Sequence, residues 1–152
     1  MQIAPKLIIG MAISAIVMLA ADNSVGTWKF NPAKSKNAGQ MKARTDVRES
    51  TPDGGIKVTR TEEPSQGVSS NATFAYKYDG KDYPASGTRF DTISSKKVDA
   101  NTWTWEVKKT GGKYHQTGKN VISKDGKTLT QTFKGTDADG KPVHGTNVYD
   151  KQ

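Results

Sequence analysis

The chain has 152 residues, contains no cysteine, and carries a formal net charge of +8 from 23 basic and 15 acidic residues. This length provides one domain with a substantial core, and the lack of cysteine excludes disulfides and a cysteine nucleophile. The basic residues are dispersed rather than clustered, which argues against a nucleic-acid-binding surface. Solvated lysines on exposed strand faces explain the charge more simply, and an anionic envelope surface is the other partner that the charge suggests.

The first 21 residues have the pattern of a secretory signal. Lys6 precedes a predominantly apolar run, Leu7 to Ala21, which ends in two small residues before Asp22. An uncleaved anchor is the alternative, but the run is shorter than the ~20 apolar residues of a spanning helix. We therefore predict a signal at 1–21 and one exported domain at 22–152, secreted or periplasmic, without a transmembrane span after processing. Removal of Lys6 leaves a net charge of 8 − 1 = +7.

The composition of the remaining chain favours strands. Leu129 is the only leucine after Ala21, which argues strongly against a helical bundle, whereas Thr, Val, Tyr and Trp are frequent. Turn signals rich in Gly, Pro, Asn and Asp recur about every eight to twelve residues, as in an all-β meander. They predict ten strands and no helix, at 25–30, 41–49, 56–62, 69–78, 81–85, 88–98, 102–109, 113–123, 128–134 and 140–151.

Three local details of these strands can be predicted. Asp79-Gly80 is a strong signal for a two-residue hairpin, and Pro84 should lie at an edge, a bulge or a strand end. The strand at 88–98 is ambiguous, because Phe90 and Ile93 fall on opposite faces of an alternating pattern.

Alternation within the strands predicts one face rich in aromatic residues and another rich in charges. In the strand at 41–49, the inner face is predicted to carry Met41, Ala43, Thr45 and Val47, and the outer face Lys42, Arg44, Asp46 and Arg48. Several polar side chains remain on the presumed inner face of other strands: Arg60, Gln116, Asn120, Gln131, Asn147 and Tyr149.

A dry β-sandwich core would not tolerate so many polar groups unless each were paired. A barrel with a partly polar interior accommodates them. We therefore predict an all-β fold, an antiparallel up-and-down barrel of about eight to ten strands, closed by pairing of 25–30 with 140–151.

Short motifs at both ends carry a family resemblance. Gly26-Thr27-Trp28 matches the lipocalin G-x-W signature, and the opening G-T-W-K-F and terminal T-N-V-Y-D-K are similar to the first and last strands of fatty-acid-binding proteins. The chain thus resembles the calycins. It also resembles small secreted lipocalin-like proteins of soil bacteria over nearly all of its mature length, through G-T-W-K, Y-D-G-K-D-Y-P, S-K-D-G-K-T-L-T and D-G-K-P. The resemblance implies a barrel that carries a small hydrophobic or amphipathic molecule and needs no cofactor.

Two features depart from the fatty-acid-binding group. In the last strand of that group an arginine, followed two residues later by a tyrosine, holds a carboxylate. Tyr149 stands at the tyrosine position, but Asn147 replaces the arginine, so the charge for a fatty-acid head group is predicted to be missing. The segment 31–40 is also too short, and too rich in Asn, Gly and Lys, for the helix-turn-helix lid of that group.

Candidate ligand-binding residues are the presumed inward side chains that could line a cavity: Arg60, Phe74, Tyr76, Trp103, Trp105, Tyr114, Asn147 and Tyr149. Trp103 and Trp105 either line a cavity or fill the barrel as core. Trp28 is better explained as a packed plug at the closed end than as a ligand contact. A buried Arg60 needs a partner, either Glu49 or a ligand anion, unless it extends from a strand end to solvent.

No catalytic constellation emerges, since Gly-x-Ser-x-Gly and phosphate-binding glycine loops are absent from the sequence. His115 and His144 are predicted on outer faces of non-adjacent strands, and Asp137 and Asp139 in an ordinary turn rather than a calcium loop. We expect a binding protein rather than an enzyme, with no metal. The alternative is a barrel filled by its own side chains that acts through its basic exterior as an envelope-associated interaction protein.

Overall fold

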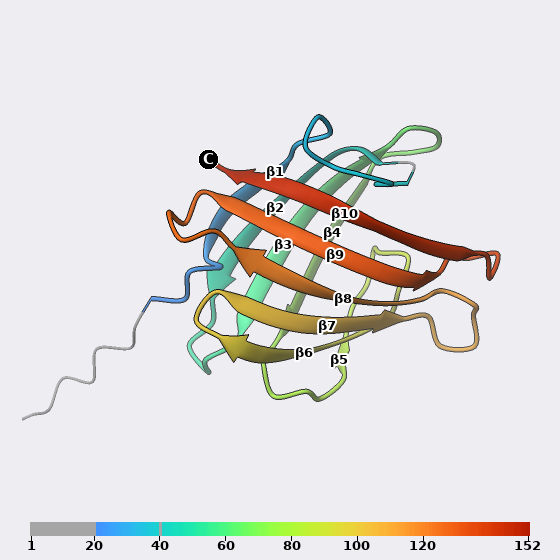
Figure 1. The fold of residues 1–152 in the computed structure, drawn as a ribbon. Helices are drawn as coiled ribbons and strands as arrows, with labels where there is room; N and C mark the ends of the chain where they lie inside the picture. Colours follow the sequence, from blue (N-terminus) through green and yellow to red (C-terminus); the bar gives the residue numbers. More distant parts are fainter. Residues whose placement is uncertain (1–20, 40) are drawn as a thin grey trace, which may run out of the picture.

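The computed structural model describes residues 21–39 and 41–152, in which ten strands form one antiparallel sheet curled into a barrel (Figure 1). Residues 1–20 of the signal predicted at 1–21 lie outside these residues, and the signal stays a prediction. The described part of the chain contains no helix, and hence none suited to cross a membrane. The strands are β1 Gly26–Phe30, β2 Met41–Ser50, β3 Ile56–Pro64, β4 Ser70–Tyr76, β5 Tyr83–Pro84, β6 Thr92–Asp99, β7 Thr102–Lys108, β8 His115–Ile122, β9 Thr128–Thr136 and β10 Pro142–Lys151.

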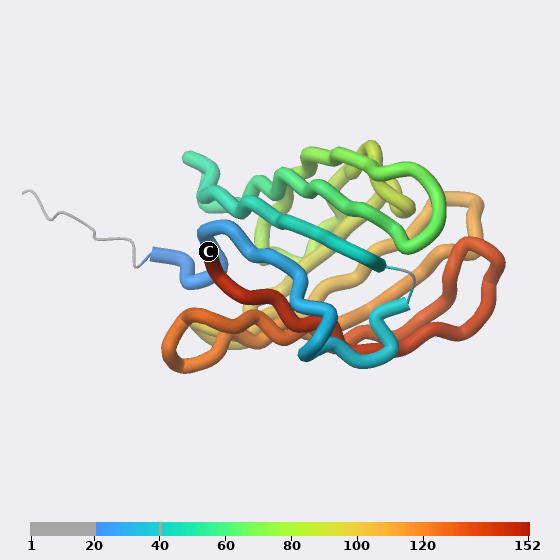
Figure 2. The backbone as a smooth tube through the Cα atoms, turned by 90° about the horizontal axis from the view of Figure 1, so that it is seen from above, coloured from blue at the N-terminus to red at the C-terminus, as the bar shows by residue number. Residues whose placement is uncertain are grey.

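The two ends of the chain meet in the sheet, as predicted. β1 pairs antiparallel with β10, with Trp28 opposite Lys151 and Phe30 opposite Tyr149. Figure 2 shows β1 running beside the C-terminal strand. The other neighbours follow one another along the chain in the order β4-β3-β2-β1-β10-β9-β8-β7-β6-β5. Between β4 and β5 the seam is spanned by an isolated bridge from Phe74 to Ala85, so the predicted antiparallel barrel is confirmed and nearly closed.

The seam explains where local predictions failed and where they held. Asp79-Gly80 does not form a two-residue hairpin, because β5 lies across the seam from β4; instead the Gly80 N–H donates to the Ser95 carbonyl at 2.8 Å. The predicted strand at 81–85 shrinks to β5, where Pro84 lies at the sheet edge as expected for a residue without an N–H. Phe90 lies before β6, so its side chain does not have to follow the alternation of that strand. Both Phe90 and Ile93 are therefore buried.

The core at the closed end is built around Trp28. Its side chain is fully buried, and its indole N–H donates to the Ser24 carbonyl at 2.8 Å. The Ser24 hydroxyl lies 3.1 Å from the Tyr78 hydroxyl, so the segment before β1 covers this end of the barrel. Trp28 is not on the cavity wall described below, which confirms the prediction of a packed plug.

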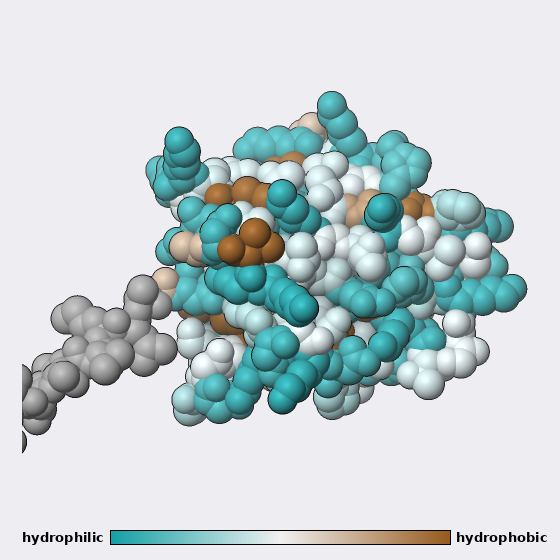
Figure 3. All heavy atoms as spheres, turned by 60° about the horizontal axis from the view of Figure 1, so that its bottom comes forward, coloured by the Kyte–Doolittle hydropathy of each residue, from teal (hydrophilic) through white to brown (hydrophobic). Residues whose placement is uncertain are grey.

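The exterior is predominantly polar. On the face shown in Figure 3, hydrophilic side chains predominate and hydrophobic ones occur in small separate groups. Exposed ion pairs, such as Lys42 of β2 with Glu63 of β3 and Lys108 of β7 with Asp82 just before β5, contribute little to stability.

Candidate functional site: a charged cavity inside the barrel

A cavity of about 840 Å³ lies within the barrel. Small-molecule sites commonly have ~300–1,000 Å³. Segments at one end of the barrel, 37–39 and 137–142, contribute to its wall together with inward side chains of most strands. All eight predicted site residues lie on this wall: Arg60, Phe74, Tyr76, Trp103, Trp105, Tyr114, Asn147 and Tyr149. That they contact a ligand stays a prediction.

The predicted orientation of β2 is wrong. Arg44, Asp46 and Arg48 point into the barrel and line the cavity, whereas Val47, predicted inside, is 36% exposed. A register shift between Met41 and Ala43 places Met41 on the same inner face as the charged residues that follow it. Met41 and Arg44 therefore both reach the cavity, and the charges of β2 become its main polar feature.

Arg60 is held by Asp46, its direct neighbour across β2 and β3. Its Nε and Nη2 each donate at 2.8 Å to one carboxylate oxygen of Asp46, and its guanidinium lies 5.4 Å from the Phe74 ring centroid. The inward direction predicted for Arg60 is correct. Of the two partners predicted for Arg60, Glu49 is wrong, because Glu49 is exposed and pairs with Lys57.

The ionisation of Asp46 follows from its surroundings. Burial alone would raise the pKa of Asp46, but the charges of Arg60, Arg44 and Arg48 outweigh it and lower that pKa below its ordinary value. Asp46 is therefore a carboxylate at neutral pH.

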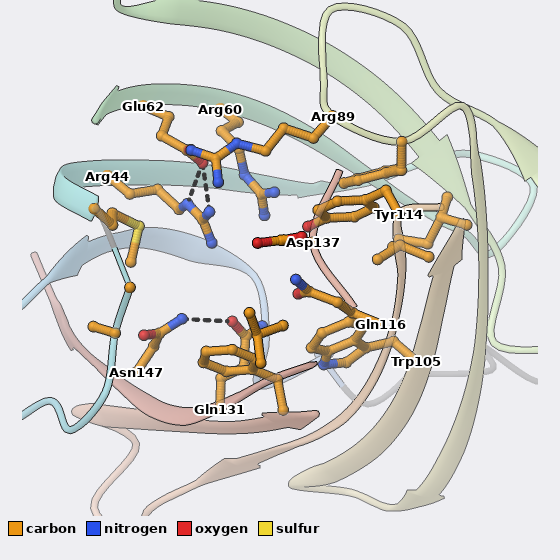
Figure 4. Close-up of a pocket in the computed structure, with 18 of the residues that line it drawn as sticks. Arg44, Arg60, Glu62, Arg89, Trp105, Tyr114, Gln116, Gln131, Asp137 and Asn147 are labelled. Carbon is orange, nitrogen blue, oxygen red and sulfur yellow. Dashed lines mark hydrogen bonds and ion pairs between the residues drawn. The ribbon is translucent and has the colours of Figure 1, made fainter. Parts of the chain in front are cut away.

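Glu62 on β3 joins two arginines. Arg44 donates to Glu62 Oε2 from Nε at 3.0 Å and also from Nη2, and Arg89 donates to Oε1 at 3.0 Å (Figure 4). Burial would raise the pKa of Glu62, but Arg44 and Arg89 lower it overall. Arg44 Nη1 also donates to the Tyr149 hydroxyl at 3.0 Å. The guanidinium beside Tyr149, predicted to be missing because of Asn147, is thus supplied by β2.

Arg48 is the buried arginine without a carboxylate partner among the described residues. It is 5% exposed, its Nη2 donates to the hydroxyls of Tyr76 and Tyr78 at 2.8 and 3.2 Å, and its Nε is buried with no acceptor in that part of the chain. Burial raises the pKa of both phenols, which remain neutral and do not balance the charge. Its guanidinium lies 5.0 Å from the Trp103 ring centroid.

The opposite wall carries a row of amides. Trp105 Nε1 donates to Asn120 Oδ1 at 2.8 Å, and Gln131 Nε2 donates to the same oxygen at 3.2 Å. Asn147 Nδ2 in turn donates to Gln131 Oε1 at 3.2 Å (Figure 4). We call these four residues, from β7, β8, β9 and β10, the amide row. Asn147 Oδ1 at its end is buried and has no donor among the described residues.

The histidines and the 137–139 turn take no part in these hydrogen-bonded pairs, although His144, Asp137 and Asp139 also line the cavity. His115 is exposed, with its Nε2 2.7 Å from Glu106 Oε1, and His144 on β10 is exposed as well. Asp137 Oδ1 accepts the backbone N–H groups of Asp139 and Lys141, both at 2.9 Å, as a turn carboxylate does. Across 21–39 and 41–152, no group of three or more His, Cys, Asp or Glu side chains is placed to hold a metal ion.

Comparison with known proteins identifies the architecture. The wild-type fluorescent protein UnaG superposes with a TM-score of 0.59 at 17% identity, covering 86% of this chain and 98% of that one. A point mutant of UnaG gives a TM-score of 0.59 at 16% identity, with coverage of 86% and 96%. No protein-family model matches the chain, and no curated protein sequence does. Likeness at such low identity establishes the fold, and the fold is that of a calycin-like β-barrel.

Proposed function

We propose that the protein binds a small amphipathic molecule, with an apolar body and an anionic group, inside its barrel. The size of the cavity supports binding of a small molecule. Its apolar wall, including Phe74, Phe90, Trp105, Leu129 and Phe133, suits the apolar body.

The observation that carries the anionic part of the proposal is the surplus positive charge of the interior. Arg44 and Arg60 are matched by Glu62 and Asp46, but Arg48 is left without a carboxylate among the described residues. An uncompensated buried charge is costly, at several kcal/mol by general experience. A ligand carboxylate, sulfonate or phosphate near Arg48 would offset that cost and gain charge-assisted hydrogen bonds.

A barrel filled by its own side chains, acting as a basic interaction protein, receives less support. Its premise is a packed interior, whereas about 840 Å³ of this interior is free of protein atoms. The lysines on the outer strand faces are consistent with either function, because they also keep sheet edges soluble.

Anion selectivity provides the first test. Dodecanoate should bind at least about tenfold more tightly than dodecanol, a factor that corresponds to about 1.4 kcal/mol. Replacement Arg48→Met should abolish this preference without unfolding the barrel, since it removes an unpaired buried charge. The measurement is titration followed by tryptophan emission, to which Trp103 and Trp105 on the wall should respond.

The matched control is Lys119→Met, which removes the same charge from an exposed position on β8. It should preserve the preference of the wild-type protein. Equal affinity of the wild type for the acid and the alcohol would contradict the proposal, and an equal effect of Lys119→Met would assign the preference to overall charge.

We also propose that the protein acts outside the cytoplasm, on the basis of the signal-like pattern at 1–21. Asp22, the first residue after it, is already part of the fold, since its carboxylate contacts Lys97 Nζ at 3.0 Å and accepts the Ser24 N–H at 2.8 Å. Intact-mass analysis of protein from the culture medium or periplasm should show a chain that begins at Ala21 or Asp22. Retention of residues 1–20 would contradict cleavage.

A further inference from the structure

The orphan acceptor at the end of the amide row points to a second chemical requirement of the ligand. Asn147 is 5% exposed and lines the cavity, yet its Oδ1 receives no hydrogen bond from the described residues. A buried acceptor left unpaired carries the full cost of its lost hydration, so a group that donates to it gains affinity.

Trp105 fixes which atom of Asn147 is left without a hydrogen bond. An indole nitrogen can only donate, so Asn120 must turn its oxygen toward Trp105. The same oxygen then accepts from Gln131 Nε2, which turns Gln131 Oε1 toward Asn147. Asn147 must therefore donate from its Nδ2 to Gln131 Oε1, and its Oδ1 is left without a hydrogen bond.

The alternative orientations are unfavourable. Rotating the Asn147 amide alone would place its oxygen against Gln131 Oε1, bringing two acceptors together. Reversing the whole amide row would place the Asn120 NH₂ against the Trp105 N–H, bringing two donors together. The amide row therefore has one direction, and the group left unpaired at its end is an acceptor rather than a donor.

We propose that the ligand carries, besides its anionic group, an N–H or O–H donor that binds Asn147 Oδ1, and that Trp105 is the residue that positions this selectivity. The inference rests on the proposed function. It places simple fatty acids, which have no such donor when ionised, below amphipathic acids with a polar N–H or O–H in the body, such as acylated amino acids.

The test uses three probes that share their acyl chain and carboxylate: an N-acylglycine, its N-methyl counterpart and the corresponding ester of glycolic acid. The amide retains the donor, whereas the other two lack it. Titration calorimetry is carried out with all three probes at several acyl-chain lengths. The N-acylglycine should bind about tenfold more tightly than the ester of the same chain length, which has a similar volume.

Two variants attribute this preference to the amide row. Asn147→Leu removes the acceptor at similar volume, and the amide and ester should then bind equally. Trp105→Phe leaves Asn147 in place but removes the donor that fixes the direction of the row, so the preference should fall severalfold although the proposed contact residue is unchanged. Because Trp105→Phe is conservative, it also serves if Asn147→Leu fails to fold. Lys119→Met on the outer face should retain the full preference.

The outcomes separate the two levels of the proposal. If no anionic probe binds at any chain length, the proposed function is contradicted and this inference falls with it. If anionic probes bind but amide and ester are equal in the wild type, the proposed function stands and the donor requirement is wrong. A preference that survives both Asn147→Leu and Trp105→Phe would assign it to another residue and overturn the role of the amide row.

Discussion

Replacing Asp46 by alanine is expected to lower the free energy of unfolding by about 3–5 kcal/mol, a large share of the stability of a domain this size. The substitution leaves Arg60 without the carboxylate that accepts both of its side-chain hydrogen bonds, inside a barrel where Arg48 already lacks one. Chemical denaturation at neutral pH, monitored by far-UV circular dichroism, measures the loss.

The pH dependence of this variant provides a second readout. The pKa of Asp46 is lowered in the folded state, so its stabilising contribution is present above the unfolded value of ~3.9 and is lost as the pH falls through the lower folded value. Wild type and Asp46→Ala should therefore begin to converge in stability as the pH falls below about 4, and the difference should vanish only below the folded pKa of Asp46. A constant difference down to the acid limit would contradict this origin of the effect.

Two controls identify the buried charge as the cause. Glu49→Ala removes a carboxylate three positions further along β2, but the Glu49 and Lys57 pair is exposed, and stability should be nearly unchanged. The double replacement Asp46→Leu with Arg60→Met removes both charges and should recover much of the loss. If Glu49→Ala lowers the free energy of unfolding as much as Asp46→Ala does, the loss does not come from leaving a buried charge unpaired.

The fold could be predicted from the sequence because its signals are local and redundant. Turn residues bound the strands, and the first and last strands share a pattern that fits pairing of the chain ends, as observed for β1 and β10. The failures occur at the seam, where β5 pairs across to β6 and not with β4, so that Asp79-Gly80 connects strands that are not hydrogen-bonded as a hairpin.

The charged half of the site was missed because burial was inferred from hydrophobicity. In β2 the apolar and charged residues alternate equally well in either orientation, and placing the apolar ones inside is the wrong choice in a polar cavity. The hairpin between β2 and β3 contained the missing signal. Once Val58 and Arg60 are inward, the residues directly opposite them, Arg48 and Asp46, must share their face.

The amide row shows what alternation can and cannot provide. Asn120, Gln131 and Asn147 were correctly placed on the inner face from the alternation of side chains along β8, β9 and β10. Their mutual hydrogen bonds depend on the register between strands, which sets Asn147 opposite Gln131 and Gln131 opposite Asn120. Register follows from turn geometry and packing over the whole sheet, and short motifs do not contain it.

Truncation of two tryptophans should produce the other large effect. Trp28→Ala should mainly lower stability, whereas Trp105→Ala should mainly lower ligand affinity. Trp28→Ala should lower the free energy of unfolding by about 3–5 kcal/mol, since it empties a fully buried site and removes the donor to the Ser24 carbonyl. Ligand affinity of the folded protein should change little, because Trp28 is not on the cavity wall.

Trp105→Ala should show the reverse pattern, with a smaller loss of stability and a marked loss of affinity for the N-acylglycine probe. Its indole is half-buried and lines the cavity, so truncation enlarges an existing space while removing both apolar contact and the donor to Asn120. Denaturation and calorimetry on both variants give the two quantities, and Trp28→Phe replaces Trp28→Ala if the latter does not fold. Equal stability losses with unchanged affinity would place both indoles in the core and contradict binding at this wall, because a side chain that contacts the ligand cannot be removed without weakening the complex.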